Sequence, residues 1–479
     1  MESDEFRRHG YALVDWVADY LANSDRYPVL SRVSPGDVRN ALPPSAPEHG
    51  EPFEQILQDF ERIIVPGLTH WNHPGFLAYF AITASAPGVL AELLSAALNQ
   101  QAMLWRTSPA ATELEEVALG WLRRLLGLPD AFEGVIYDTA SIASLHALTA
   151  AREVLVPDVR RAGLAGRPEV GRLRVYASEH AHSSIDKAVI LLGLGHDALR
   201  RIACDHEFRM RADALQSAIA EDRSAGIRPI AVVGTIGTTS TTSVDPIREI
   251  AGVCEREGLW LHVDAAYAGV IAMIPECRAR FEGWERADSI VVNPHKWLFT
   301  PFDLSAFYCR RMDVVRAAFA LVPEYLRTAE GERGVRNLMD TGIQLGRRFR
   351  SLKLWMILRH FGAEQLRRTL AGHMRLAQQF AAWVDADPDF ERLAPAPFSV
   401  VCFRARPRNV PLAHAQLDRL NEELLAAVNS SGEVFLSHTR VNDVIALRLA
   451  IGHLRTTERH VARAWQLLRE HAAQLVRSI

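Results

Sequence analysis

The sequence predicts an α/β protein in which a mostly parallel sheet is flanked by helices. Short apolar runs alternate with helical patterns from about residue 86 onward. Compact apolar strands between helices are typical of a parallel sheet that is covered on both faces. The chain has 479 residues and is 48% hydrophobic, which is enough for two or more domains with a sizeable core.

Charge and composition narrow the function class. The net charge of −3 shows none of the basic excess of a nucleic-acid-binding protein. No apolar run reaches the roughly 18 residues of a membrane span, and the N-terminal residues lack the apolar stretch of a signal peptide. The five cysteines are scattered without a CxxC pair, as in a reducing compartment. We therefore expect a cytoplasmic protein without a nucleic-acid or membrane partner.

Residues 1–85 are predicted to form an N-terminal helical arm. Residues 6–24 have apolar positions at helical spacing, and a proline-rich connector follows at 41–52. A second helical pattern at 53–68 leads into the segment HWNHPGFLAYF. This part lacks the strands for a sheet of its own. We expect it to pack on another element, such as a second subunit.

Residues 86–360 are predicted to form the large α/β domain. Functional groups in such sheets gather where strands end and loops begin. The expected helices include 113–128, 141–156 and 211–225, and the expected strands are 134–137, 172–178, 200–204, 229–237, 259–267, 289–295 and 305–310.

Residues 361–479 are predicted to form a smaller C-terminal α+β domain. A long helix is expected to begin near Gly346 and to lead into this domain. The apolar runs at 398–406 and 444–452 have the character of strands and are flanked by helical patterns.

Lysine is scarce in this chain. Only Lys187, Lys296 and Lys353 are lysines, although the chain has 54 lysines and arginines together. A guanidinium stays protonated, whereas a lysine amine can lose its proton and form a Schiff base. A lysine kept against this bias is a candidate for amine chemistry, and the alternative is that all three are chance survivors.

Polar side chains follow three consecutive predicted strands of the large domain. An aspartate ends one buried strand, and a lysine follows the next strand. About one strand–helix–strand step separates these two residues, so both can face one site. The polar residues are Thr238, Thr239 and Asp245 after 229–237, Asp264 within 259–267, and Asn293, His295 and Lys296 after the run SIVV.

These residues fit the requirements of pyridoxal 5′-phosphate. This cofactor needs a lysine amine and a carboxylate against its pyridine nitrogen, which Lys296 and Asp264 supply. It also needs hydroxyl and N–H donors for its phosphate, best at a helix N-terminus. Thr139, Ala140 and Ser141 stand at the start of a predicted helix after the strand 134–137.

Each of these residues also has a purely structural interpretation. Asp264 or the Thr139–Ser141 group can cap a helix, and Asn293 before a proline is an ordinary turn signal. His182 can be a polar residue at a strand–helix joint. A metal site at His70 and His73 is not expected, because no third ligand is near them in the sequence.

The ordered motifs resemble one family. HVDAAYAG and NPHKWL look like the pyridoxal-phosphate-dependent group II amino-acid decarboxylases, the aromatic-L-amino-acid decarboxylase family. The segments HWNHPGFLAYF, SPAATELEEVALGWL, AHSSIDKA, GTIGTTSTTSVDPI, PEYLRT and LGRRFRSLKLW resemble family segments in the same order. The resemblance covers nearly the whole chain.

The resemblance implies roles for matching positions. Lys296 would carry the cofactor, Asp264 would partner the pyridine nitrogen, His182 would stack on the cofactor ring and help to place the substrate carboxylate, and Ala266 would pack on the other ring face. The phosphate would be surrounded by Thr139, Ala140, Ser141, Asn293 and His295, with Thr239 nearby.

The resemblance also implies the architecture and the substrate. The family has fold type I and is homodimeric, with sites at the subunit interface and an N-terminal arm that wraps the partner. The substrate would be an L-amino acid, most simply an aromatic one that loses CO2 to give an amine. A wall for its flat side chain would be built from Trp71, Tyr79, Phe80, Gln101 and Met103, with Gly346 as in members that use aromatic substrates.

One departure from the family pattern leaves an alternative open. Many members carry a loop tyrosine, thought to reprotonate the carbanion, and an ungapped match places Leu338 there. Tyr325 or His182 would then deliver the proton, or the intermediate would react with oxygen as in the family's aldehyde synthases. His182 favours decarboxylation, since some aldehyde synthases lack it. A third hypothesis is an inactive cofactor-binding homologue, which intact Lys296, Asp264 and His182 argue against.

Overall fold

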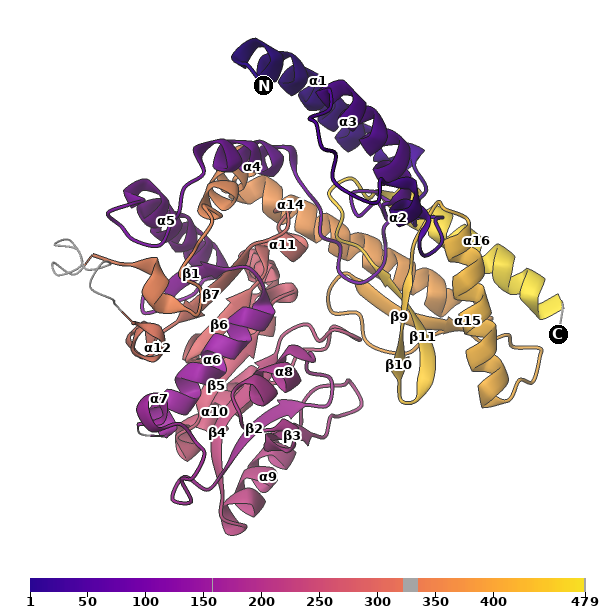
Figure 1. Cartoon of the computed structure of the whole chain (residues 1–479). Coiled ribbons are helices and arrows are strands. Elements are labelled where there is room, and N and C mark those ends of the chain that lie inside the picture. Colours follow the sequence, from indigo (N-terminus) through magenta and orange to yellow (C-terminus); the bar gives the residue numbers. More distant parts are fainter. Residues whose placement is uncertain (157, 322–334, 478–479) are drawn as a thin grey trace. The chain divides into compact units, whose positions relative to one another are not determined.

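The computed structural model describes residues 1–156, 158–321 and 335–477 (Figure 1). The described chain divides into two compact units. Unit 1 contains residues 1–81, 379–393 and 403–479, and unit 2 contains residues 82–378 and 394–402. The N-terminal residues thus share a unit with the C-terminal ones, and the expected boundaries at 85 and 360 stay a prediction.

Unit 2 is built on a seven-stranded sheet with the strand order β1-β7-β6-β5-β4-β2-β3. Strand β7 runs antiparallel to β1 and β6, and the other neighbouring pairs are parallel. This confirms the mostly parallel sheet. The strands are β1 (Glu133–Tyr137), β2 (Arg172–Ser178), β3 (Leu199–Ile202), β4 (Ile227–Thr235), β5 (Trp260–Asp264), β6 (Ser289–Val292) and β7 (Ser305–Cys309).

Helices flank this sheet in the pattern that the alternation predicts. Helix α6 packs on the central strands, from β4 through β7, while α5 packs on β1, α8 and α9 contact β3, and α10 contacts β4 and β5. Up to residue 321, the described helices of unit 2 are α4 (Ala86–Leu98), α5 (Pro109–Leu126), α6 (Ala140–Leu155), α7 (Val159–Ala162), α8 (Ser184–Leu191), α9 (Ala212–Ser224), α10 (Ile247–Glu257), α11 (Pro294–Trp297) and α12 (Met312–Phe319).

Local sequence explains where these elements begin and end. Helix α5 starts with Pro109, which needs no N–H partner at that position, and ends before Gly127, whose φ of 76° suits a glycine. Strands β5, β6 and β7 are buried along their whole length, which explains why they are apolar without alternation.

The long helix α14 (Ser351–Ala386) begins five residues later than the sequence pattern indicates. The backbone N–H of Arg347 donates to Oε1 of Gln101 at 2.6 Å, and its guanidinium reaches Glu115 and the carbonyl of Ile136. These bonds hold the segment before Ser351 away from a helical path. The helix also kinks at Gly362, whose φ is 65°.

Unit 1 combines helices with most of a four-stranded sheet of order β10-β11-β9-β8. The pairs β10–β11 and β8–β9 are antiparallel, which confirms a smaller sheet near the C-terminus. Its elements are α1 (Ser3–Ala22), α2 (Asp37–Ala41), α3 (Phe53–Asp59), β8 (Phe390–Arg392), the end of β9 (Val400–Ala405), α15 (His414–Ser430), β10 (Ser437–Val441), β11 (Val444–Ala450) and α16 (Glu458–Arg477).

Short helical turns complete the chain. They are η1 (Ser24–Arg26), η2 (Phe60–Ile64), η3 (Val65–Gly67), η4 (His196–Ala198), η5 (Ala268–Met273), η6 (Pro275–Phe281), η7 (Trp284–Arg286) and η9 (Leu338–Thr341). Within the described residues, no helix is long and apolar enough to cross a membrane.

Candidate active site

The candidate site lies at the carboxyl edge of the seven-stranded sheet, where β4, β5 and β6 end side by side. Backbone hydrogen bonds join the segments that leave these strands. The N–H of Ile236 donates to the carbonyl of Asp264 at 2.9 Å, and the N–H of Asn293 donates to that of Ala266 at 3.0 Å. The three polar segments predicted from the sequence are therefore neighbours in the structure.

Lys296 follows β6 on the short helix α11. Its backbone N–H donates to the carbonyl of Asn293 at 2.9 Å, which fixes the turn that carries it. Burial lowers the pKa of the Lys296 amine, and the charge of Asp264 opposes this shift. A lowered pKa increases the share of neutral amine, which is the nucleophilic form.

Asp264 ends β5 as a buried carboxylate that is only 7% exposed. Its Oδ1 accepts a hydrogen bond from the N–H of Ala266 at 3.0 Å, so Ala266 lies directly beside it. The negative charge of Asp264 raises the pKa of both Lys296 and His182. One carboxylate thus acts on both candidate groups.

His182 lies in the loop between β2 and α8. Its Nδ1 accepts a hydrogen bond from the backbone N–H of Ser184 at 3.1 Å and lies 2.9 Å from the Ser184 hydroxyl. Burial lowers the pKa of His182, Asp264 raises it, and Lys296 lowers it further. The structure therefore brings His182, Asp264 and Lys296 within electrostatic reach of one another.

Asn293 and His295 hold the turn around Lys296 against β7. The hydroxyl of Ser305 donates to Oδ1 of Asn293 at 2.6 Å, and the N–H of Leu304 donates to Nδ1 of His295 at 2.9 Å. Burial lowers the pKa of His295 to about 3, and the charge of Lys296 adds to the shift. His295 is therefore neutral beside the lysine.

Thr139, Ala140 and Ser141 stand at the start of α6, as the sequence predicts. The N–H and hydroxyl of Thr139 both donate to Oδ1 of Asp138, at 2.5 and 3.0 Å. The side chain of Thr139, the N-cap residue, makes no capping hydrogen bond to the first turn of α6. The N–H groups of that turn can therefore bind an anion, which the helix dipole favours.

The loop after β4 carries a chain of hydroxyl groups. The hydroxyl of Thr241 lies 3.1 Å from that of Thr238 and 2.8 Å from that of Ser243, and Thr239 is exposed beside them. Asp245 closes the loop, because its carboxylate accepts the N–H groups of Met210 and Thr235 at 2.7 and 2.8 Å.

The predicted substrate-wall residues fall into two sets, one in each unit. In unit 1, Trp71 stacks near Tyr79 with a ring-centroid distance of 5.9 Å, and Arg448 lies 5.5 Å from the ring centroid of Phe80. In unit 2, Gln101 is anchored to Arg347, and the carbonyl of Met103 accepts the N–H of Met339 at 3.1 Å. Each set is held together within its own unit.

Leu338 does not occupy an exposed loop. It begins η9, is 1% exposed, and belongs to the apolar core that also contains Tyr137 and Phe307. The expectation that this position lies on a loop facing the site therefore does not match its burial. Tyr325, the alternative proton donor, lies outside the described residues.

The two histidines considered for a metal have other partners. Nδ1 of His70 lies 3.0 Å from the Tyr20 hydroxyl, and Nδ1 of His73 accepts the N–H of Gly75 at 2.8 Å. No group of three histidine, cysteine, aspartate or glutamate side chains in the described part of the chain could hold a metal ion.

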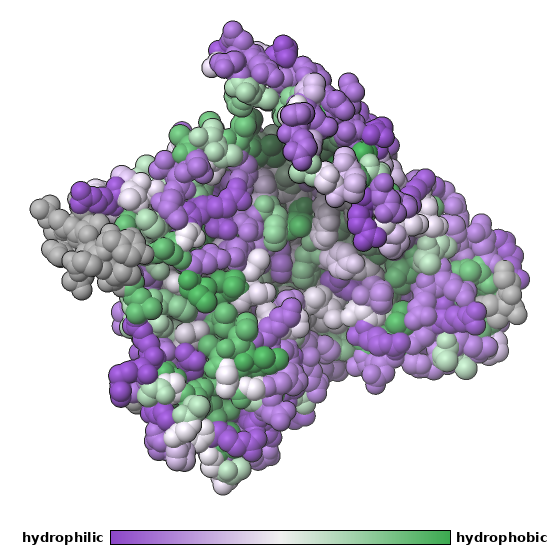
Figure 2. All heavy atoms as spheres, viewed as in Figure 1, coloured by the Kyte–Doolittle hydropathy of each residue, from purple (hydrophilic) through white to green (hydrophobic). Residues whose placement is uncertain are grey.

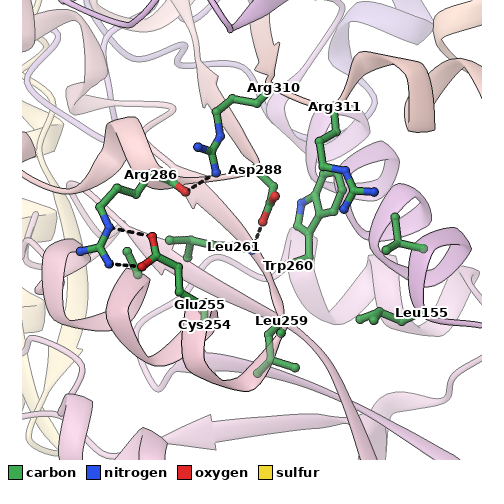
Figure 3. A pocket seen from close by; sticks show the side chains of 13 residues that line it. Leu155, Cys254, Glu255, Leu259, Trp260, Leu261, Arg286, Asp288, Arg310 and Arg311 are labelled. Carbon is green, nitrogen blue, oxygen red and sulfur yellow. Dashed lines mark hydrogen bonds and ion pairs between the residues drawn. The ribbon is translucent and has the colours of Figure 1, made fainter.

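A separate cavity of about 260 Å³ lies at the opposite, amino edge of the same sheet (Figure 3). Trp260 begins β5 there, and Arg310 and Arg311 follow β7. Arg286 forms a two-fold ion pair with Glu255, as Figure 3 shows. Ligands of parallel sheets bind outside the carboxyl ends of the strands, so this cavity is not the candidate active site.

The groups at the carboxyl edge fit pyridoxal 5′-phosphate chemically. Lys296 offers an amine of lowered pKa, Asp264 offers a buried carboxylate, and α6 offers an uncapped N-terminus with the Thr139 hydroxyl. Sequence reasoning did not assign a role to Arg201, which holds the His182 loop. Its only signal in the sequence is that it is one of two adjacent arginines in the short strand β3.

Comparison with known proteins identifies the family. Residues 35–406 match the pyridoxal-dependent decarboxylase conserved domain. The chain is 41% identical to phenylacetaldehyde synthase of Arabidopsis thaliana, over 99% of this chain and 97% of that protein. It is 40% identical to tyrosine decarboxylase 2 of the same plant, over 100% of this chain and 89% of that protein.

A solved structure agrees with this match. The crystal structure of Oryza sativa TDC with PLP and tryptamine is 36% identical, covers 99% of both chains, and superimposes with a TM-score of 0.95. The resemblance inferred from the motifs and the fold expected from it are thereby confirmed. The chain belongs to the pyridoxal-dependent decarboxylase family and is a carboxy-lyase that depends on pyridoxal phosphate.

Proposed function

We propose that this enzyme removes CO2 from an aromatic L-amino acid to give the corresponding arylalkyl amine. The observation that carries the proposal is the convergence of Lys296, Asp264 and His182 at one edge of the sheet, where Asp264 and Lys296 both act on His182. Relatives named tyrosine decarboxylase and a neighbour solved with tryptamine support an aromatic substrate.

Each of the three groups has a distinct task in this proposal. Lys296 offers an amine whose pKa burial lowers, which increases the share of its neutral, nucleophilic form. Asp264 holds a proton at the pyridine nitrogen, since a buried carboxylate stabilises a nearby positive charge. His182 holds the substrate carboxylate. When bound, pyridoxal phosphate supplies the electron sink for the carbon that loses CO2.

The remaining predicted residues would hold the cofactor and the substrate. Ala266 is small and buried beside Asp264, and a flat ring can pack against it. The phosphate would be held by Thr139, Ala140, Ser141, Thr239, Asn293 and His295. The aromatic side chain of the substrate would contact Trp71, Tyr79, Phe80, Gln101 and Met103.

The functional unit in this proposal is a cytoplasmic homodimer, in which the arm of residues 1–85 packs against the partner and the sites lie at the interface. Helix α4 supports the dimer, because four of its leucines are 45–54% exposed: Leu90, Leu93, Leu94 and Leu98. Hydrophobic side chains also reach the surface at several places on the face shown in Figure 2. Such exposed apolar groups are typical of an interface.

A second candidate function is an aldehyde synthase that decarboxylates and then oxidatively deaminates its substrate. The ungapped match of Leu338 to the family's loop tyrosine favours it, because a leucine cannot donate a proton. The similarity to a phenylacetaldehyde synthase also favours it. The two functions differ in oxygen consumption and in the release of ammonia and hydrogen peroxide.

One assay tests the proposal and separates the two functions. The purified protein is incubated with the twenty amino acids, DOPA and 5-hydroxytryptophan, and mass spectrometry identifies amines and aldehydes. Oxygen uptake per CO2 near zero supports the amine, and a ratio near one supports the aldehyde. An absence of CO2 from every aromatic substrate contradicts both functions.

A further inference from the structure

The ring of His182 is held from one side by the start of α8. The backbone N–H of Ser184 donates to Nδ1 at 3.1 Å. A backbone N–H can only donate, so Nδ1 must be the acceptor, and the single proton of a neutral imidazole then resides on Nε2. The Ser184 hydroxyl, 2.9 Å from the same nitrogen, can only add a second donation.

We propose that Ser184 and Arg201 are positioning residues that hold His182 as a neutral imidazole with its proton on Nε2. His182 then acts as a hydrogen-bond donor to the substrate carboxylate and not as a base. The role of the ring toward substrate rests on the proposed function, whereas its tautomer rests on the contacts of Ser184 alone.

Arg201 fastens the loop that carries His182. It projects from β3, and its guanidinium donates to the carbonyls of Ser178 and Ala181 at 3.0 and 3.4 Å. It also donates to Asp186 on α8 at 2.6 Å. These contacts join the end of β2, the residue before His182 and the helix after it. One charged side chain thereby fixes both ends of the loop.

Charges of both signs act on His182 from the elements packed around it. Asp264 at the end of β5 and Asp186 on α8 raise its pKa, while Lys296 on α11 and Lys187 on α8 lower it. His182 is exposed in unit 2, so its protonation state is inferred from the hydrogen bond that the N–H of Ser184 donates to Nδ1 at 3.1 Å. This contact favours the neutral ring, because a protonated Nδ1 would face the N–H of Ser184.

This arrangement has a chemical consequence. An Nε2–H group can hold a carboxylate in place and can release CO2 without transferring a proton. A neutral imidazole gives up its remaining proton far less readily than an imidazolium does. His182 is therefore not the group that protonates the substrate carbon, and that proton must come from another residue or from water.

The first test reads the tautomer directly. In protein labelled with ¹⁵N-histidine and loaded with cofactor, the His182 signals are assigned by their loss in His182→Asn. We expect an unprotonated Nδ1 and a protonated Nε2 near pH 7.5. A protonated Nδ1 overturns the proposal, and neither result depends on which reaction the enzyme catalyses.

The second test perturbs each contact. Ser184→Ala removes one donation to Nδ1 and should raise the His182 pKa, read from the same signals, by about 0.5–1 unit. The control is Ser183→Ala, because Ser183 is exposed and makes no hydrogen bond to the ring among the described residues. Equal shifts in the two variants contradict a role for the Ser184 hydroxyl.

Arg201→Met should broaden the His182 ring signals and lower kcat by about 10- to 100-fold, because a misplaced group near the reacting atoms costs that much. Arg201→Lys should recover part of both. The control is Arg211→Met, since Arg211 pairs with exposed Asp213. Unchanged His182 signals in folded Arg201→Met would overturn the role of Arg201.

Discussion

The two edges of the seven-stranded sheet differ in how far their charged side chains are exposed to water, although β5 and β6 contribute residues to both edges. At the carboxyl edge, Asp264 is 7% exposed and Lys296 has a lowered pKa. At the amino edge, Arg286 and Glu255 form an ion pair with exposed fractions of 34% and 56% (Figure 3). Asp264 at the carboxyl edge is therefore shielded from water far more than the ion pair at the amino edge.

The difference is informative because burying charge is expensive. An unpaired buried charge costs several kcal/mol, whereas exposed ion pairs contribute about 0–1 kcal/mol. Groups held at a strained protonation state gather at functional sites. The contrast therefore distinguishes buried charges with a functional role from exposed charges that only interact with water. Variants at the two edges can test this distinction.

The largest expected effect is at Lys296. Lys296→Arg keeps the positive charge but cannot form a covalent bond with the cofactor, so decarboxylation should fall by more than about 10³-fold. Visible absorbance of the bound cofactor should be lost. Borohydride reduction of the wild type should label the peptide that contains Lys296.

The amino edge offers the matched control. Arg311→Lys changes a basic residue whose guanidinium lies 5.8 Å from the Trp260 ring centroid, and it should leave activity and absorbance unchanged. A label on a peptide with Lys187 or Lys353 would contradict the inference from lysine scarcity.

The next effect is at Asp264. Asp264→Ala should cost about 3 kcal/mol or more of barrier, or about 10²-fold in kcat, because the pyridine nitrogen loses the partner of its proton. Asp264→Glu should recover little, since an extra methylene displaces the carboxylate by about 1 Å.

The control at the amino edge is Asp288→Asn. Burial raises the pKa of Asp288, and its carboxylate accepts the N–H of Leu261 at 2.8 Å. Its loss should lower stability without changing kcat. An equal loss of kcat in the two variants would remove the distinction between the edges.

Sequence patterns predicted the carboxyl edge well because its signal is local. Strands β4, β5 and β6 are short apolar runs, and the polar residue that ends each one is visible in the sequence. Asp264 and Lys296 could be paired because strands in parallel sheets end at a common edge. These features need no knowledge of distant contacts.

Other features depend on contacts between distant residues and could not be predicted. The start of α14 depends on Arg347, whose partners Gln101 and Glu115 lie more than 230 residues earlier in the chain. The burial of Leu338 depends on its packing in a core with residues from β1 and β7. The clamp of Arg201 on the His182 loop likewise joins residues that no periodic pattern connects.

The third prediction concerns His262, in the middle of β5 between the two edges. His262 is fully buried between the hydroxyls of Ser144 and Ser289, and burial lowers its pKa to about 4. Between this value and the unfolded value of about 6.5, the unfolded state binds more protons. Stability from this group is therefore complete above pH 6.5 and is lost as the pH falls toward 4.

When the pH falls from 8 to 5, the lowered pKa of His262 should reduce the free energy of unfolding by about 2 kcal/mol. His262→Asn cannot titrate, so its stability deficit relative to the wild type should shrink by that amount over the same interval. Urea unfolding followed by tryptophan fluorescence measures the difference. A deficit that is constant with pH would mean that His262 does not have a lowered pKa.

The smallest effect is expected at the amino edge. Glu255→Gln breaks the ion pair with Arg286, whose two side chains are 34% and 56% exposed. Water solvates both groups after the change, so the free energy of unfolding should fall by no more than about 1 kcal/mol. The deficit should also shrink in 1 M salt, where screening acts within about 3 Å.

The value of kcat should not change in Glu255→Gln, because the substitution removes no charge that the protein keeps from water. A fall in kcat with intact folding would show that the amino edge is coupled to Lys296 through β5 or β6, and the two edges would then have to be treated as one electrostatic unit.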